Sequence, residues 1–291
     1  MRHALTIDLE EFFQIHALSD VVAVDSWDTF SSAVEDNTGR ILDLLDEASV
    51  SATFFCLGWV AQRKRALIRD IHARGHEIAC HGHLHQLVTS QTPGAFREDV
   101  SKAKSILEEC TGEGVAGYRA PTYSITEKTL WALDVLEELG FSYDSSIFPI
   151  YHDTYGIPDA IRHPHRLPGR RLVEFPISTV QIGPVNMPVS GGGYFRLLPY
   201  PLTRAALRSI EKSGEPFIFY IHPWEVNRRT PRMDGMTVLS RFRTYVGITR
   251  SFGRFRSLVG DFSFTTARNV LCDRGLLETP ADGGCRSKAV C

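Results

Sequence analysis

The chain has 291 residues, 43% of them hydrophobic and 23% charged, and its formal net charge at pH 7 is −2. These values are ordinary for a soluble, well-packed protein, and the length allows one large α/β domain more readily than two small ones. A near-neutral chain lacks the global basic field of nucleic-acid-binding proteins, so the composition argues against that class.

Two further features bear on where the protein works. The six cysteines form no CxxC pair and have no regular spacing, so we expect free thiols in a reducing compartment rather than a disulfide framework. A strand-like stretch already begins at Ala4, which leaves no room for a signal peptide, and no run approaches the roughly 18 apolar residues of a membrane span. With Met1 as the natural start, we expect a cytoplasmic protein.

Short β-rich runs alternate with helical patterns along the chain, and this alternation indicates a parallel α/β fold. Strands are predicted at residues 4–8, 52–57, 77–81, 117–120, 141–145, 172–175, 216–222 and 262–267. Helices are predicted between them at residues 37–48, 60–74, 95–110, 126–139, 202–213 and 236–252. Six to eight such steps predict a distorted (β/α) barrel over residues 1–271, followed by a polar, poorly ordered tail over residues 272–291.

Unusual polar residues follow several of these strands, where a (β/α) barrel places its chemistry. The first strand ends in TIDLEE, with Asp8, Glu10 and Glu11, and the third ends in HGHLH. His81 and His85 are four residues apart and share a face of a turn or helix, a spacing that suits one metal ion. A carboxylate from a neighbouring strand would complete a two-histidine, one-carboxylate site. Taken singly, each motif is also compatible with a solvated loop.

The other strand ends carry candidates for acid–base chemistry. Arg119, in RAPTY, can hold a carboxylate through paired hydrogen bonds, or it is a structural surface residue. His222 closes the most apolar strand, where a histidine serves either in acid–base catalysis or as a packed core residue. Asp144 ends the fifth strand. The same spacing argument turns His83 away from the other two histidines of HGHLH, which places it on the surface or behind the site.

Read in order, the segments TIDLEE, HGHLH, RAPTY, YDSS and YIHPWE resemble the motifs of the polysaccharide-deacetylase family, also called the NodB-homology or carbohydrate esterase family 4 group. The resemblance covers roughly residues 4–225. IDLEEFFQ, GGGYFRLLPY and FYIHPWE are similar to a subgroup associated with exopolysaccharide biosynthesis loci. The resemblance implies a distorted, TIM-like (β/α) barrel of about seven strands and a metal-dependent hydrolase that removes N-acetyl groups from amino sugars.

The resemblance also implies roles for single residues. Asp8 matches the catalytic base of the family, and Arg119 matches the arginine that orients it. His222 matches the catalytic acid, and Asp144 is placed where the family has the acid that orients this histidine. His81 and His85 match the two metal-binding histidines, and the implied ion is zinc, with Co²⁺, Ni²⁺ and Fe²⁺ as alternatives.

One position departs from the commonest family pattern, in which two aspartates are adjacent and the second binds the metal. Here Leu9 follows Asp8, so the carboxylate ligand must come from further along the chain. Alternation along a strand puts Asp8 and Glu10 on the same side and Leu9 on the other. We therefore expect Glu10 to be the ligand, with Glu11 as the second choice.

The expected reaction is hydrolysis of an acetamide, with the oxyanion stabilised in part by a backbone N–H near Tyr123. Tyr123 and Trp224 either contact the sugar or pack in the core. The glycine run 191–193 is expected to shape a substrate-side loop, because no strand-to-helix context makes it a phosphate loop. Two alternatives stay open: hydrolysis of another linear or cyclic amide, as in allantoinase-like relatives, and a carbohydrate-binding pseudoenzyme.

A local basic region stands out in a chain that is nearly neutral overall. Between residues 228 and 256 the only acid is Asp234. Eight arginines lie in this stretch, at positions 228, 229, 232, 241, 243, 250, 254 and 256. They form either a solvated face or a contact with an anion, such as a diphosphate that links the sugar to its carrier or a membrane surface. The apolar residues of the helix predicted at 236–252 are expected to pack against the barrel.

Overall fold

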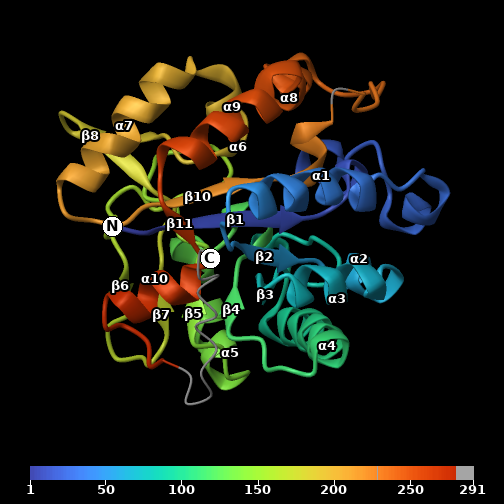
Figure 1. Ribbon diagram of the computed structural model, residues 1–291. Coiled ribbons are helices and arrows are strands. Elements are labelled where there is room, and N and C mark those ends of the chain that lie inside the picture. Colours follow the sequence, from blue (N-terminus) through green and yellow to red (C-terminus); the bar gives the residue numbers. More distant parts are fainter. Residues whose placement is uncertain (228, 280–291) are drawn as a thin grey trace.

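The computed structural model describes residues 1–227 and 229–279. Its centre is one curled sheet with the strand order β10-β1-β2-β3-β4-β5-β7-β6, and β11 also pairs with β1 (Figure 1). The strands are β1 (His3–Leu9), β2 (Thr53–Cys56), β3 (Glu77–Cys80), β4 (Gly117–Tyr118), β5 (Tyr143–Asp144), β6 (His165–Arg166), β7 (Val173–Glu174), β10 (Ile218–Ile221) and β11 (Phe264–Thr265).

Within the described residues every pairing in this sheet is parallel except that of β6 with β7. The ladder runs from β10 at one edge to β6 at the other, so the sheet is part of a barrel rather than a closed one. This arrangement confirms the predicted distorted (β/α) barrel. Because the strands are parallel, their carboxyl ends meet at one rim, where the polar residues singled out above are gathered.

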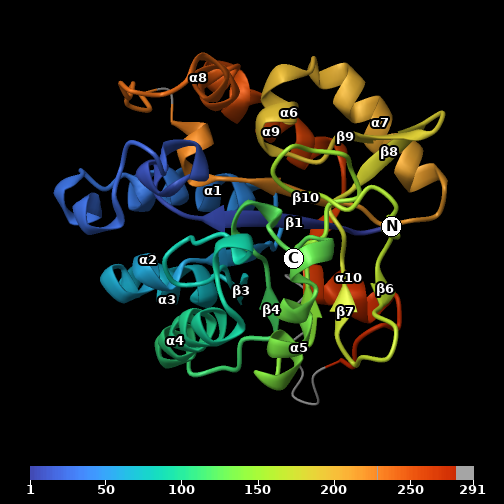
Figure 2. The ribbon, with the colours of Figure 1, turned by 180° about the vertical axis from the view of Figure 1, so that it is seen from behind.

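Helices connect and cover the strands, as Figure 2 shows from the other side. They are α1 (Val34–Glu47), α2 (Gly58–Arg63), α3 (Arg65–Ala73), α4 (Pro93–Thr111), α5 (Trp131–Glu138), α6 (Gly192–Leu197), α7 (Tyr200–Lys212), α8 (Val238–Tyr245), α9 (Ile248–Asp261) and α10 (Ala267–Asp273). The central strand β1 is buried on both faces, with all seven of its residues buried, as expected for a parallel sheet. No helix in the described part of the chain is long and apolar enough to cross a membrane.

Several elements differ from the sequence-based expectation. The helix predicted at 60–74 is two helices, α2 and α3, because Lys64 leaves the helical region with φ −123°. The helix predicted at 236–252 is likewise divided into α8 and α9 by Gly247, which has φ +69°. An antiparallel hairpin, β8 (Thr179–Ile182) and β9 (Val185–Pro188), was not predicted. The helix α10 extends to Asp273, into the segment expected to be a tail, and residues 280–291 of that segment lie outside the described residues.

The predicted packing of α8 against the barrel holds for Tyr245, which lies against a buried aromatic cluster, and fails for the apolar residues before it. Val238, Leu239 and Phe242 are 88%, 54% and 53% exposed. Ile248, at the start of α9, is buried in a cluster that includes Trp224. The break at Gly247 therefore separates a helix that packs, α9, from one that presents apolar side chains to solvent.

Candidate metal and catalytic site

A cavity of about 430 Å³ opens at the carboxyl ends of the parallel strands. Five of the residues predicted to carry the chemistry line it: Asp8, Glu10, His81, His85 and His222. They come from the ends of β1, β3 and β10 and from the loop that follows β3. The topology thus brings together residues that are more than 200 positions apart in the sequence.

Glu10, His81 and His85 offer one ligand atom each within 4.8 Å of one another. The His85 Nε2 lies 2.9 Å from the Glu10 Oε2. His81 directs its other nitrogen, Nδ1, to the carbonyl oxygen of Arg119 at 2.8 Å, which fixes the ring and leaves Nε2 for a ligand. Burial lowers the pKa of His81 to about 3, so its imidazole is neutral, as metal binding requires.

The donor set fits a divalent cation. The Glu10 Oε2 is buried, and apart from the His85 Nε2 at 2.9 Å no described residue offers it a hydrogen-bond donor, a shortfall that a cation would relieve. Burial alone would raise the pKa of Glu10, but the two nearby histidines His85 and His222 outweigh it and lower this pKa, which keeps the carboxylate ionised. Two imidazoles and one carboxylate leave open positions for water and substrate.

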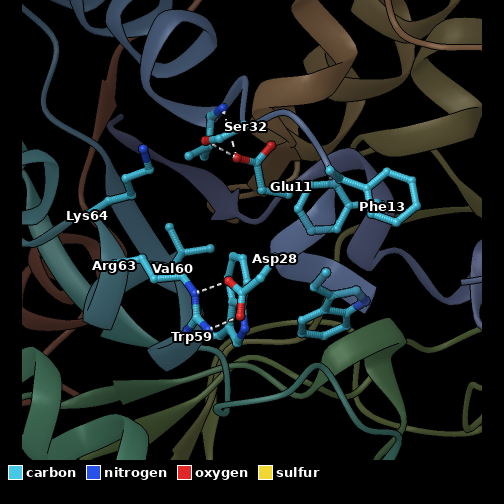
Figure 3. A pocket seen from close by; sticks show the side chains of 11 residues that line it. Glu11, Phe13, Asp28, Ser32, Trp59, Val60, Arg63 and Lys64 are labelled. Carbon is cyan, nitrogen blue, oxygen red and sulfur yellow. Dashed lines mark hydrogen bonds and ion pairs between the residues drawn. The ribbon is translucent and has the colours of Figure 1, made fainter. Parts of the chain in front are cut away.

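Glu11, the second-choice ligand, points away from this cluster. Its carboxylate accepts hydrogen bonds from the Ser32 hydroxyl at 2.5 Å, the Ala33 amide at 3.2 Å and the Val34 amide at 3.3 Å, at the start of α1. Figure 3 shows Glu11 turned toward Ser32, in a separate pocket of about 270 Å³. A carboxylate at a helix N-terminus satisfies amides that have no partner within the helix. Glu11 therefore has a structural role, and Glu10 is the member of the pair that faces the cavity.

The HGHLH segment is a loop rather than a helix. Gly82 and His85 both adopt positive φ, +75° and +52°. Asp99 of α4 holds the loop by accepting hydrogen bonds from the amides of His83 at 2.7 Å and Leu84 at 3.2 Å. The His83 side chain is buried against Gly58 rather than exposed on the surface. Asp99 was missed by sequence reasoning because a single acid on an amphipathic helix carries no distinguishing signal.

Asp8 and Arg119 form a buried ion pair. The Arg119 Nη1 donates to the Asp8 Oδ1 at 2.6 Å and to the Thr6 hydroxyl at 2.8 Å. On its other side, Arg119 donates to the carbonyl and the hydroxyl of Ser145, at 3.2 Å and 3.0 Å. The guanidinium is fully buried, so its position is set from several directions. The second oxygen of Asp8, Oδ2, lies 3.8 Å from the His222 Nε2 and faces the cavity.

Glu225, and not Asp144, orients His222. The Nδ1 of His222 lies 2.9 Å from the Glu225 Oε2, and the His222 amide donates to the same oxygen at 2.9 Å. Arg196 in turn donates to the Glu225 Oε1 at 2.5 Å, and both of these side chains are buried. Burial alone would lower the pKa of His222, but the carboxylates of Glu225 and Glu10 outweigh it and raise this pKa to about 9.

Asp144 belongs to a different network, which corrects its predicted role. The Ser146 hydroxyl donates to the Asp144 Oδ1 at 2.5 Å and accepts from the amide of Ala120 at 2.8 Å, so Asp144 supports the turn that follows Arg119. Asp144 is fully buried beside a second buried carboxyl group, Glu174. Burial raises the pKa of Asp144 to about 6.

Tyr123 and Trp224 both line the cavity but are largely buried. The indole of Trp224 stacks on His222 with ring centroids 5.4 Å apart, and its Nε1 donates to the Glu10 Oε1 at 3.2 Å. Trp224 therefore contacts His222 and the Glu10 carboxylate at once. Tyr123 has φ +53°, and its amide already donates to the Ala120 carbonyl at 3.0 Å, so an oxyanion would need another donor nearby.

The glycine run forms the first turn of α6 rather than a loop. Gly191 has φ +145°, and a Cβ at this position would lie 2.1 Å from the Tyr220 carbonyl oxygen of β10. Gly192 and Gly193 line the cavity. Arg196, which was not singled out in the sequence, comes from the same short helix.

The basic region is divided between structural and exposed arginines. Arg254 donates to three carbonyl oxygens, those of Phe195, Arg196 and Leu198. Arg243 lines the cavity and lies 3.8 Å from Asp153. The first residue of the region, Arg228, lies outside the described residues.

Comparisons with known proteins identify the family of the domain. The polysaccharide deacetylase family matches residues 23–143, and a domain of unknown function (DUF3473) matches residues 145–272. The chain contains a polysaccharide deacetylase domain of the NodB-homology type. His222, Glu225 and Arg196 all fall in the second segment, so the two segments contribute to one site.

Among curated relatives, the chain is 26% identical to the peptidoglycan-N-acetylglucosamine deacetylase of Bacillus cereus over 147 residues. The matched segment covers 46% of this chain and 53% of the relative. The chain is 36% identical over 100 residues to the chitooligosaccharide deacetylase of Sinorhizobium fredii, covering 34% and 44%. The chain thus spans about half, or less, of the length of these relatives.

Two solved structures share the fold over most of the chain. A protein from Mycobacterium smegmatis assigned to the polysaccharide deacetylases has a TM-score of 0.61 and 21% identity, with 94% of this chain and 89% of that chain covered. The Puue allantoinase has a TM-score of 0.57 and 16% identity, with 92% and 87% covered.

Proposed function

We propose that the protein is a metal-dependent N-deacetylase of an amino sugar carried by an oligosaccharide, a polysaccharide or a precursor of one. The observation that carries the proposal is the position of Asp8. One of its oxygens is held by Arg119, and the other faces the cavity between the carboxylate of Glu10 and the imidazole of His222. A base, a ligand set and an acid therefore surround one space.

Glu10, His81 and His85 would hold the cation, and zinc suits two imidazoles and one carboxylate. When bound there, a divalent cation supplies Lewis acidity, which makes water more acidic and polarises an acetyl carbonyl group. Trp224 helps to fix the carboxylate, because its indole N–H donates to the Glu10 Oε1.

Asp8 acts as the general base and accepts a proton from the attacking water. Arg119 holds the carboxylate with one oxygen aimed at the cavity, since it donates to the oxygen that faces away from His222. The resulting tetrahedral carbon carries a new C–O bond and still carries the bond to nitrogen. Breaking that C–N bond requires a proton on the nitrogen, because an amine anion is a very poor leaving group.

His222 supplies that proton from Nε2, the ring nitrogen that faces the cavity. Its other nitrogen is held by Glu225, which stabilises the protonated ring. With a pKa raised to about 9, His222 carries its proton at neutral pH. The products are acetate and a free amine on the sugar.

The substrate assignment rests on the polysaccharide deacetylase domain and on relatives that are named for peptidoglycan and chitooligosaccharides. The similarity to sequences from exopolysaccharide loci favours a bacterial export polysaccharide. Arg243, at the wall of the cavity, offers a guanidinium to a phosphate if the sugar is joined to its carrier by one.

The test is acetate release from N-acetylhexosamine oligomers, measured with the metal content defined, beside allantoin as a cyclic amide. Asp8→Asn is expected to lose about 10²–10⁴-fold in kcat while keeping the metal, because Asp8 is the base and not a ligand. Asp25→Asn, at an exposed aspartate that does not line the cavity, serves as the matched control.

Three outcomes would contradict the proposal. Turnover of allantoin without acetate release would assign the site to cyclic amides. Metal binding without any hydrolysis would indicate a binding protein. Loss of the metal from Asp8→Asn would move Asp8 into the ligand set.

A further inference from the structure

The helix α8 exposes an apolar stripe that is unusual for a surface helix. Val238, Leu239 and Phe242 are 88%, 54% and 53% exposed. Residues 238 and 242 are one helical turn apart, and residue 239 lies beside them, so the three side chains share one face. Exposed apolar residues scattered singly are normal, but a contiguous group of them marks a contact surface.

Arginines lie on both flanks of this stripe. Arg241 and Arg243 precede and follow Phe242, and each is rotated from it by about 100° around the helix axis. Both are half exposed, and so are accessible to a partner. From residue 235 to residue 260 the sequence contains no acidic residue, and the acids that approach the two arginines are Asp234 at 3.9 Å and Asp153 at 3.8 Å.

In both ribbon views α8 lies at the outer edge of the molecule, away from the central sheet (Figures 1 and 2). It is also part of the rim of the catalytic cavity, since Leu239, Ser240 and Arg243 line that cavity. Whatever contacts the outer face of α8 is therefore adjacent to the entrance of the site.

From the combination of an apolar stripe and flanking arginines, we infer that α8 is the contact surface of this protein for an anionic lipid bilayer. Short amphipathic helices of this kind lie in the plane of the interface, with the apolar side chains among the acyl chains and the basic ones at the headgroups. The charge complementarity favours this occupant, because anionic headgroups would surround an inserted apolar stripe and meet the arginines on both of its flanks. The bilayer would then hold the cavity entrance at headgroup level, where a lipid-linked sugar is presented.

This inference stands apart from the proposed deacetylation, because lipid binding is measured without turnover. The full chain is mixed with vesicles of phosphatidylcholine alone, or of phosphatidylcholine and phosphatidylglycerol in equal parts, and sedimented. We expect the protein to sediment with the anionic vesicles and to remain in the supernatant with the neutral ones.

Two variants remove the two components of the surface without touching the cavity lining. Val238→Ser combined with Phe242→Ser is expected to lower the partition constant at least tenfold at any salt concentration. Arg241→Ser is expected to lower it about fivefold at low salt, the contribution of one basic residue near an anionic leaflet, and to have less effect at high salt. All three side chains are exposed, so the variants should keep the thermal stability of the wild type.

The matched control is the hairpin β8–β9, which exposes Ile182 and Val185 by 63% and 54% and contains no charged residue. Ile182→Ser combined with Val185→Ser should leave vesicle binding unchanged. The inference is overturned if the wild type does not sediment with anionic vesicles. It is equally overturned if the hairpin variant loses as much binding as the α8 variant, or if the α8 variant loses none.

Discussion

At the level of single residues, the protonation of His222 depends on two buried charged side chains: Glu225, which contacts its ring, and Arg196, which contacts Glu225. Arg196 donates to one oxygen of Glu225, and the other oxygen of Glu225 holds the His222 ring. The arginine keeps Glu225 ionised: although burial alone would raise the pKa of Glu225, Arg196 and His222 lower it to about 2. An ionised Glu225 favours the protonated form of His222.

Replacing Glu225 by glutamine should therefore change the pH dependence of the reaction as well as its rate. The acid must be protonated, so the wild-type activity is expected to fall as the pH rises through the pKa of His222, which Glu225 raises above the ordinary histidine value. In Glu225→Gln the pKa of His222 is lower, and the alkaline limb of kcat should move toward the ordinary histidine value of about 6.5. The measurement is kcat and kcat/KM for acetate release as a function of pH.

Glu113→Gln is the control for this prediction, because the Glu113 side chain is 73% exposed and remote from the cavity. A uniform fall in kcat for Glu225→Gln, with the alkaline limb unmoved, would contradict the assigned role. Glu225 would then support the fold of the turn without setting the proton affinity of His222.

The sequence predicted most of this site because its residues stand in motifs at strand ends. Asp8, Glu10, His81 and His85 meet as expected, since alternation and spacing are local properties of the chain. Glu225 was part of the HPWE motif, and a carboxylate three residues after a histidine was a usable signal. Arg196 and Asp99 gave no such signal, because each acts through a contact between segments that are distant in the sequence.

At the level of elements, the connection from β9 into α6 passes so close to β10 that one position has no room for a side chain. Gly191→Ala would place a Cβ 2.1 Å from the Tyr220 carbonyl oxygen, at a φ of +145°. We expect a loss of about 2–4 kcal/mol in the free energy of unfolding, measured by urea denaturation.

Gly193→Ala is the matched control for that change. Its nearest neighbour would lie 3.7 Å away, an ordinary contact, and its φ is not positive. The stability of this variant should stay within about 0.5 kcal/mol of the wild type. Equal losses for both variants would show that α6 tolerates no side chain for some reason other than the approach to β10.

The division of long helical patterns was the main failure of sequence reasoning at this scale. Apolar periodicity continues through Lys64 and through Gly247, and neither residue forbids a helix by itself. The break at Gly247 follows from packing, because a Cβ there would lie 2.1 Å from the carbonyl oxygen of Arg196. The contact joins segments about 50 residues apart, so the periodicity of the local sequence carries no sign of it. Without that contact, the exposure of α8 could not be predicted.

At the level of the whole molecule, β1 joins the beginning of the chain to its end. It pairs with β10 on one side, and with β2 and, at its first residues, β11 on the other, in one parallel sheet. The segments matched by two separate families therefore share a core and a site, and neither contains all the residues of the cavity. We expect one cooperative unfolding transition for the described fold.

The buried carboxyl groups of Glu174 and Asp144 should make the stability of this fold depend on pH. Burial raises the pKa of Glu174 well above its usual value of 4.5, and Asp144 raises it further. As the pH rises past about 4.5, the unfolded chain releases this proton before the folded one does, so the wild type loses stability until the folded group ionises.

Glu174→Gln removes that loss, since an amide does not titrate. At about pH 8 we expect the variant to be more stable than the wild type by about 1–3 kcal/mol, with the difference vanishing near pH 4. Urea denaturation across this range, with exposed Glu127→Gln as the reference, measures it. A variant less stable than the wild type at both ends would mean that the fold requires the carboxyl group of Glu174 itself, whether protonated or not, which would contradict the prediction.

The hydrogen bonds of Arg196 bear on how such an enzyme diverges. Its guanidinium lies over the Trp224 ring and donates to Glu225, and its other hydrogen-bond acceptors in the described part of the chain are backbone oxygens at the rim of the cavity, those of Arg243, Thr244 and Val246. A carbonyl oxygen is the same whatever residue carries it. Mutation can therefore exchange the side chains of this rim, and with them the preferred sugar or its carrier, while the proton donor keeps its geometry. At this edge of the fold, substrate preference can therefore change in evolution while the catalytic residues keep their positions.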